Sequence, residues 1–154
     1  MKRLCALLCL SFFSVSAVSG AGAQSWNEID WFDDAAGYAR AVSLAQESGD
    51  PVLVYFYADW CPYCRQLNTE LLADADVQAQ VGKMLAVRVN AEAGPDERSL
   101  AGHYRVRGYP ALYLYTSAQG GSFAPIRRTT GGDSGAVRLK TSQEFVETLR
   151  GDGP

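Results

Sequence analysis

The feature that most constrains this chain is a pair of cysteines placed just after a run of apolar residues. The run is Val52–Tyr57, which is rich in β-branched and aromatic side chains. A continuous run of this kind predicts a strand covered on both faces, as at the centre of a mixed sheet. The motif Trp60-Cys61-Pro62-Tyr63-Cys64 follows, and Asp59–Cys61 is the expected turn into a helix. The two cysteines therefore lie where a central strand gives way to a helix.

That position changes the chemistry of the two thiols. The N-terminus of a helix offers unpaired N–H groups and a partial positive charge, which stabilise a thiolate on the first cysteine. The second cysteine follows one turn later, within disulfide reach of the first. The spacing predicts that Cys61 is an exposed nucleophile and that Cys64 is the resolving thiol, which attacks a mixed disulfide.

Residues 1–23 have the pattern of a secretory signal peptide. Lys2 and Arg3 form a basic start, and Leu4–Val18 is an apolar run without charge. The small residues Ala21–Ala23 are those that a signal peptidase needs. Serines interrupt the run, which is shorter than the roughly 20 residues of a membrane-spanning helix. We therefore expect cleavage near Ala23 rather than a membrane anchor.

Removing this leader changes the meaning of the four cysteines in the chain. Cys5 and Cys9 lie in the leader, so the predicted domain at 24–154 keeps only Cys61 and Cys64. A framework of several disulfides is therefore excluded. The prediction is an exported, periplasmic domain that carries one dithiol in an oxidising compartment.

The composition supports one folded domain. The chain has 154 residues, of which 47% are hydrophobic and 20% charged, and its formal net charge is −3. This is too apolar for a disordered chain and too weakly charged to bind a polyanion by bulk electrostatics. We therefore expect no nucleic-acid partner, and a monomer of single-domain size.

Alternating patterns along the chain predict an α/β domain. The expected helices are one capped by Asp33 or Asp34 and ending near Ser48, then Cys61–Leu72, Asp76–Val81, Pro95–His103, and a last one that follows the Gly131–Gly135 loop and has the capping-box pair Thr141 and Glu144. The expected strands are Val52–Tyr57, Met84–Val89, Ala111–Thr116 and one near Ile126–Thr130, the last reached by a turn at Gly120–Gly121.

Other interpretations of the cysteine pair are weaker. A structural zinc site usually takes four ligands, and the predicted domain adds only His103 as a further soft donor, so no metal site is expected. An inert structural disulfide is disfavoured because a short Cys-x-x-Cys loop at a helix start is normally redox-active. Two unrelated free thiols are unexpected in an exported protein.

Taken together, these residues resemble the thioredoxin family. The likeness is carried by Val52–Tyr57, by Ala58–Cys64 and by Val106–Pro110, and it extends over roughly Trp31 to Arg150. The segment Tyr57–Cys61 is especially similar to the C-terminal thioredoxin-like domain of the bacterial transmembrane reductase DsbD. The resemblance implies a single thioredoxin fold, with a central mixed β-sheet flanked by helices and an N-terminal helical extension.

The resemblance also implies roles for individual residues. Cys61 and Cys64 would form a redox-active disulfide that needs no other cofactor, with Trp60, Pro62 and Tyr63 as supporting residues. Tyr109–Pro110 corresponds to the segment that ends in a cis-proline in this family. It would offer a backbone edge on which an extended substrate segment pairs as an added strand.

The chain departs from the family at Tyr55, where thioredoxins often carry a buried acid that relays a proton to the resolving thiol. Tyrosine is a poor base, with a reference pKa near 10. Asp59 is closer to the cysteines in sequence, and its carboxylate is a second candidate for proton transfer. A solvated turn residue is the alternative interpretation of Asp59.

The dipeptide Pro62-Tyr63 is typical of glutaredoxins, which makes glutathione a candidate partner. Arginines that would form a basic rim for its carboxylates are Arg105, Arg107, Arg127 and Arg128. An ordinary solvated charged edge is the alternative interpretation of these side chains.

The predicted function is a periplasmic thiol-disulfide oxidoreductase that reduces protein disulfides, with electrons from a membrane donor of the DsbD type. A DsbA-like thiol oxidase and a glutaredoxin-like, glutathione-dependent reductase are alternatives in the same class. A non-catalytic peptide-binding or chaperone-like module that uses the Tyr109–Pro110 edge is the alternative from a different class.

Overall fold

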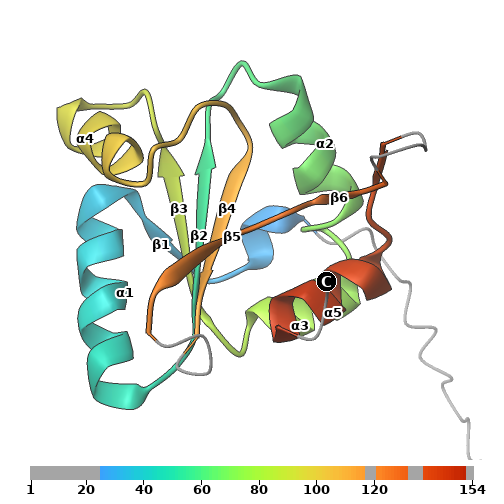
Figure 1. The fold of residues 1–154 in the computed structure, drawn as a ribbon, viewed down its shortest axis with the longest axis horizontal. Helices are drawn as coiled ribbons and strands as arrows, with labels where there is room; N and C mark the ends of the chain where they lie inside the picture. The colour runs from blue at the N-terminus through green and yellow to red at the C-terminus, as the bar shows by residue number, and fades with distance from the viewer. Residues whose placement is uncertain (1–24, 117–120, 132–136, 152–154) are drawn as a thin grey trace, which may run out of the picture.

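The computed structural model describes residues 25–116, 121–131 and 137–151 (Figure 1). The predicted leader at 1–23 lies outside the described residues. So do Gly120 and most of the predicted Gly131–Gly135 loop. Within the described ranges, no helix combines the length and apolar character needed to cross a membrane.

A five-stranded mixed sheet forms the centre of the fold, with strand order β1-β3-β2-β4-β5 (Figure 1). Its strands are β1 (Trp31–Asp33), β2 (Val52–Tyr57), β3 (Leu85–Asn90), β4 (Ala111–Tyr115) and β5 (Phe123–Ile126). β3 runs parallel to both β1 and β2, whereas β4 is antiparallel to β2 and to β5. The predicted fold class is confirmed, and β2 lies at the centre as its apolar run indicates.

The alternation of side chains along β2 divides the core into two clusters. Leu53 and Tyr55 belong to one cluster, and Val54 and Phe56 belong to the other. All four side chains are fully buried. A strand with both faces covered has no solvated side, which is why its sequence is continuously apolar instead of alternating.

Helices cover the two faces of the sheet in separate groups (Figure 1). They are α1 (Asp34–Ser48), α2 (Pro62–Glu70), α3 (Ala75–Val81), α4 (Pro95–His103) and α5 (Ser142–Arg150). α1 and α4 contribute buried alanines to the cluster that holds Phe56. α2, α3 and α5 contribute cysteine, leucine, valine and phenylalanine side chains to the cluster that holds Tyr55. The α2 face is therefore the face on which the cysteines lie.

The strands after β4 differ from the sequence prediction. A single strand near Ile126–Thr130 is wrong, because β5 ends at Ile126 and Thr129–Thr130 forms β6, which pairs with β7 (Arg138–Leu139) in a second small sheet. The register explains the break. Ile126 is opposite Leu112, only one residue from the start of β4, and Pro110 before that start has no N–H to pair.

The first helix begins where expected but is capped differently. Asp33 is its N-cap residue, yet the Asp33 side chain makes no capping hydrogen bond. Its carboxylate pairs instead with the Arg88 guanidinium on β3. This pairing is possible because Trp31–Asp33 forms the edge strand β1 beside β3, an element that the sequence pattern did not reveal. At the last helix the predicted capping box of Thr141 and Glu144 is confirmed.

The segment before β1 covers part of the α2 face. It forms a 3₁₀ turn, Trp26–Glu28, that begins with a capping box at Ser25. The Trp26 ring meets the rings of Trp31, Tyr55 and Tyr57 at centroid distances of 6.1, 6.4 and 6.2 Å. These edge-on aromatic contacts bury the tyrosines of β2 on the α2 face of the sheet.

Two helical glycines provide a test of this packing. A Cβ added to the buried Gly37 of α1 would lie 2.7 Å from the Phe32 backbone carbon, whereas one added to Gly102 of α4 would meet nothing within 4 Å. We expect Gly37→Ala to lower the free energy of unfolding by about 1–3 kcal/mol, because β1 and α1 must move apart. Gly102→Ala is the matched control and should raise the free energy of unfolding by about 0.4–1 kcal/mol, because the added Cβ has open space. Urea unfolding of both variants measures the difference, and a stabilised Gly37→Ala would contradict the close contact between β1 and α1.

Candidate active site

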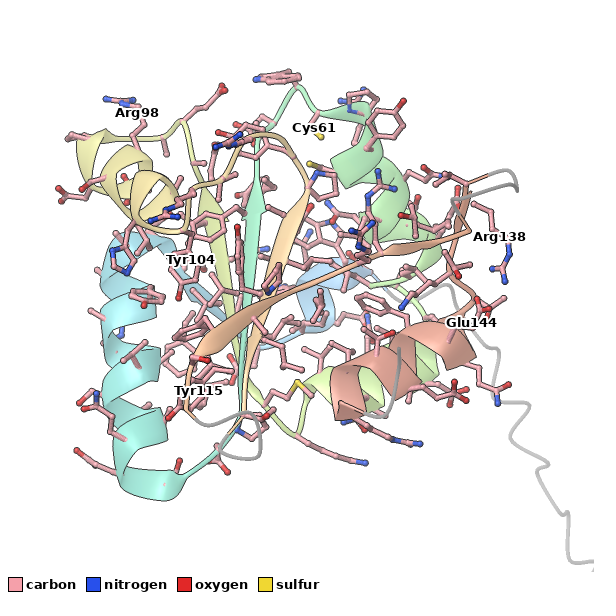
Figure 2. The ribbon with its side chains drawn as sticks, in the orientation of Figure 1. Cys61, Arg98, Tyr104, Tyr115, Arg138 and Glu144 are labelled. Atoms are coloured by element: carbon pink, nitrogen blue, oxygen red, sulfur yellow. The ribbon has the colours of Figure 1, made fainter. Side chains whose placement is uncertain are left out.

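The cysteine pair lies at the carboxyl end of the central strand, where Figure 2 shows Cys61 beside the first turn of α2. Cys61 is the N-cap residue of that helix, and Pro62 occupies its first position. A proline is well placed there because its missing N–H would have had no partner inside the helix. The Cys61 N–H donates to the Ala58 carbonyl at 3.1 Å, which closes the turn after β2. The predicted position of the motif is confirmed.

The Cys61 sulfur takes the role that a serine or aspartate oxygen takes at other helix starts. The backbone N–H of Cys64 donates to Cys61 Sγ at 3.1 Å. This N–H is one of the unpaired donors of the first helical turn, and it points along the positive end of the helix dipole. A negative charge on Cys61 Sγ is therefore stabilised by the same hydrogen bond that begins α2.

Both cysteines are free thiols, and both are buried, each with 2% of its surface exposed. The expectation that Cys61 is exposed is therefore wrong. Tyr109 packs against the core cluster that contains the two cysteines, and its ring meets the Trp60 ring at 6.2 Å. The large exposed side chains beside the pair are instead Trp60 and Tyr63, at 62% and 58%. The sulfurs thus lie under an aromatic rim.

Cys64 differs from Cys61 in its electrostatic surroundings. Burial raises the pKa of the Cys64 thiol, and a hydrogen bond with Cys61 raises it further. Hydrogen bonds with the Ala58 backbone and with Tyr55 act in the opposite direction, but burial outweighs them. Cys64 is consequently held as a neutral thiol that can donate a hydrogen bond to a thiolate on Cys61.

Tyr55 lies behind Cys64 on the same face of the sheet. Its hydroxyl donates to Asn68 Oδ1 at 3.0 Å, and both side chains are buried. In the sequence Tyr55 is visible only as a departure from the family, and Asn68 is not among the predicted site residues. A signal for Asn68 was present, since it follows Cys64 by four residues and so lies on the buried face of α2.

Asp59 is exposed and belongs to a network that holds the loop before Cys61. Its Oδ2 accepts from Asn90 Nδ2 at 3.0 Å. The Asn90 side chain in turn accepts from the Glu92 N–H, and Glu92 Oε2 accepts from Trp60 Nε1 at 2.8 Å. Asn90 is the last residue of β3 and Glu92 follows it, so their place beside the cysteines depends on the parallel pairing of β2 with β3.

The segment before β4 approaches the same end of the sheet. The Tyr109–Pro110 peptide bond is cis, as the resemblance implied. Tyr109 is half-buried, and desolvation of its ring raises the pKa of its hydroxyl. The structure therefore brings Tyr109 to Trp60 and the cysteine pair, although almost fifty residues of chain separate the two segments.

The expected basic rim is only partly assembled. The Arg128 guanidinium lies 5.2 Å from the centre of the Tyr63 ring, close enough for a cation–π contact. Arg105 instead lines a hollow on the α4 side of the sheet together with Tyr38 and His103. His103 is thus far from the cysteines, and the described part of the chain holds no group of three side chains suited to bind a metal ion.

Comparison with known proteins places these features among redox proteins. A family model described as a thioredoxin-like domain matches residues 38–136. The thiol:disulfide interchange protein DsbD of Ralstonia nicotianae is 32% identical over 112 residues, which are 72% of this chain and 17% of that protein. DsbD 1 of Pseudomonas aeruginosa is 35% identical over 88 residues, or 56% of this chain and 15% of that protein. The chain therefore spans about a sixth of the length of these relatives.

Solved structures agree with the fold. A thioredoxin from Thermus thermophilus superposes with a TM-score of 0.57 at 28% identity, covering 79% of this chain and 84% of that one. The reduced C-terminal domain of DsbD from Neisseria meningitidis gives a TM-score of 0.60 at 24% identity, covering 79% of this chain and 98% of that one. At 24% identity, the likeness to the DsbD domain supports the fold alone.

The electrostatic difference between the two thiols predicts selective alkylation. When the reduced protein reacts with iodoacetamide near neutral pH, we expect Cys61 to be modified before Cys64. The Cys64 N–H stabilises a thiolate on Cys61, whereas burial keeps Cys64 protonated. Raising the pH should increase labelling of Cys64, because a raised pKa delays its ionisation to higher pH. Peptide mass spectrometry gives the order, unfolded protein is the control, and earlier labelling of Cys64 would contradict the assignment.

Proposed function

This chain belongs to the thioredoxin-like family, and we propose that it is a periplasmic thiol-disulfide oxidoreductase that reduces disulfide bonds of protein clients. The observation that carries the proposal is the hydrogen bond from the Cys64 N–H to Cys61 Sγ at the start of α2. It prepares one sulfur of the pair as a nucleophile, while the other stays protonated beside it.

The proposed reaction is a two-step exchange that needs only these two sulfurs. The Cys61 thiolate attacks one sulfur of a client disulfide, a mixed disulfide forms, and the other client sulfur leaves as a thiol after taking up a proton. Cys64 then attacks Cys61 Sγ, which forms the Cys61–Cys64 disulfide and releases the second client thiol. Two electrons pass from the protein to the client.

The exposed aromatic rim supports a protein client. Trp60 and Tyr63 project from the surface beside the buried sulfurs, and Tyr109 closes the rim on the β4 side. An extended client segment would pair with the backbone at Tyr109–Pro110, as a strand added to a sheet edge. Because the Cys61 sulfur is buried, such pairing would also have to open access to it, so access to the sulfur would be coupled to client docking.

The direction and the compartment of the reaction are part of the same proposal. The relatives are named thiol:disulfide interchange proteins, and the matched segment is a small part of each. We therefore propose that a membrane protein of the DsbD type returns electrons to the Cys61–Cys64 disulfide. Export would depend on residues 1–23, and the domain at 24–154 would act in the periplasm.

Glutathione is a second candidate substrate because of Arg128. Its guanidinium over the Tyr63 ring lies at the rim, where it could bind a carboxylate of a small thiol. Arg105 does not share this position, so the basic rim expected from the sequence is reduced. This weaker arrangement favours protein clients as the principal substrates.

A trapping experiment tests the catalytic roles. Cys64→Ser should accumulate a mixed disulfide with a client such as insulin, because the first attack proceeds and the second cannot. Cys61→Ser should form none and should lose dithiothreitol-driven insulin reduction. Non-reducing electrophoresis and turbidity measure the two outcomes. Full function in Cys61→Ser would support a non-catalytic binding module instead.

The reduction potential of the pair decides between a reductase and an oxidase. Equilibration with a glutathione series should give a value nearer to about −270 mV, typical of a reductant, than to about −120 mV, typical of a strong oxidant. Thiol labelling followed by mass spectrometry measures the reduced fraction. A potential near the oxidising value would contradict the proposed direction while leaving the exchange chemistry in place.

A further inference from the structure

A buried polar pair, Tyr55 and Asn68, lies behind the cysteines, and the proposed exchange steps do not use it. The Tyr55 hydroxyl and the Asn68 amide meet at 3.0 Å inside the core cluster that also contains Cys61 and Cys64. Burying two polar groups costs free energy that their mutual hydrogen bond only offsets. Two apolar side chains would satisfy packing at this place equally well, so the pair suggests a role besides packing.

The position of the Tyr55 hydroxyl is fixed by its ring. Three aromatic rings surround it, with centroid distances of 6.4 Å to Trp26, 6.2 Å to Trp31 and 5.5 Å to Tyr57. The side chain is fully buried on the central strand of the sheet. The rotation of the O–H bond is therefore the main freedom left to this group.

Cys64 lies in the same buried core cluster as Tyr55, and Asn68, the partner of the Tyr55 hydroxyl, follows Cys64 by one turn on the buried face of α2. Burial raises the pKa of Tyr55, and the interaction with Cys64 raises it further. The same hydrogen bond lowers the pKa of Cys64 and so opposes part of the effect of burial. Both directions fit a hydroxyl that donates to the sulfur when the sulfur is charged, because such a hydrogen bond favours the thiolate.

The charged side chains at this end of the sheet are bonded to groups other than Tyr55 and Cys64. Asp59 is exposed and bonded to Asn90, and Arg65 donates to backbone carbonyls of the loop before Cys61. Arg88 is bonded to Asp33 on the β1 side. The titratable groups that act on Tyr55 or Cys64 are otherwise Cys61, Tyr57 and Tyr109, all of them neutral when protonated.

We propose that Tyr55, held by Asn68, is the positioning residue of the resolving step, in which its hydroxyl donates a hydrogen bond to the Cys64 sulfur as that sulfur becomes a thiolate. The inference rests on the proposed exchange at Cys61 and Cys64. In this proposal a neutral hydroxyl stabilises the second nucleophile, which is the Cys64 thiolate.

The proton balance of the step requires no base at Tyr55. The Cys64 thiol loses its proton, and its sulfur forms a bond to Cys61 Sγ. The bond between Cys61 Sγ and the client sulfur breaks, and the client sulfur takes up one proton. Tyr55 keeps its own proton throughout and acts only by turning its O–H bond toward the Cys64 sulfur.

Asn68 explains how the hydroxyl can serve both states of Cys64. With Cys64 as a thiol, Tyr55 donates to Asn68 Oδ1, as the structure shows. When Cys64 is a thiolate, the single hydroxyl proton turns to the sulfur, and the Asn68 carboxamide turns over so that its N–H donates to the tyrosine oxygen. A carboxamide is both donor and acceptor, so the buried pair stays hydrogen-bonded in either arrangement.

A two-phase reaction of the reduced protein separates the resolving step from the first attack. With excess dithiobis(nitrobenzoate), Cys61 releases one coloured thiolate in a phase that depends on reagent concentration. Attack by Cys64 releases the second in a phase that does not. Stopped-flow absorbance records both phases in the same sample.

We expect Tyr55→Phe to slow the second phase about 10- to 100-fold, the effect of losing a hydrogen bond to a charged group. The first phase should stay within about threefold of wild type, because Tyr55 donates to Cys64 and not to Cys61. Tyr104→Phe is the matched control. It removes another hydroxyl with one hydrogen bond, to Tyr38, in the cluster on the opposite face of the sheet, and should change neither phase.

A double variant keeps the test valid if the single change disturbs folding. Tyr55→Phe with Asn68→Leu removes both polar groups together, so neither is left buried without a partner. It should show the same slow second phase with an unchanged thermal unfolding midpoint or a higher one. A second phase at the wild-type rate in either folded variant would overturn the proposal.

The pH profile distinguishes a hydroxyl from a carboxylate. From about pH 6 to 9 the logarithm of the second-phase rate should rise steadily, because burial holds the pKa of Cys64 above this range. Tyr55→Phe should give a parallel line at lower rates. If Asp59→Asn slows the second phase and Tyr55→Phe does not, the role belongs to Asp59 and the proposal fails. If the first phase is missing, it is the proposed exchange at Cys61 that fails.

Discussion

The hydrogen bond from the Cys64 N–H to Cys61 Sγ connects the fold of this protein to its proposed chemistry. It is at once the N-cap of α2 and the stabilisation of a thiolate, so one contact both begins the helix and prepares the nucleophile. Its position depends on β2, since a strand buried on both faces at the centre of the sheet leaves the helix start little freedom to move. The other features of the site are arranged around this point. The aromatic rim lies above it, and the Tyr55–Asn68 pair lies behind it.

The two sulfurs are equally buried but make different interactions. Cys61 receives a backbone N–H, whereas Cys64 has a raised pKa because burial disfavours its charge. This asymmetry suits a sequence of two attacks, in which the first nucleophile is ready and the second is held back. In the proposed exchange a client would contact Trp60 and Tyr109 beside the sulfurs, so recognition and reaction would occur at one surface.

Much of this arrangement could be predicted from local patterns. The span of β2, the start of α2 at the cysteines and the capping box of Thr141 and Glu144 each depend on residues close together in the chain. The edge strand β1 could not be predicted, because three residues carry no periodicity and gain their conformation from β3. The exposure of Cys61 was predicted wrongly for a related reason: Tyr109, which packs against the core cluster that holds the pair, comes from a distant segment.

The sequence by itself therefore determined where the dithiol lies, which cysteine caps the helix, and that the strand before it is central. These properties follow from short-range spacing and from the apolar run. Only the tertiary structure decided which groups surround the sulfurs. Asn68 meets Tyr55, Glu92 meets Trp60, and Arg128 meets Tyr63, because sheet pairing and helix packing bring distant segments to one edge. A departure from the family at Tyr55, visible in the sequence as a missing acid, thereby became a hydrogen-bonded pair in the core cluster that holds the resolving thiol.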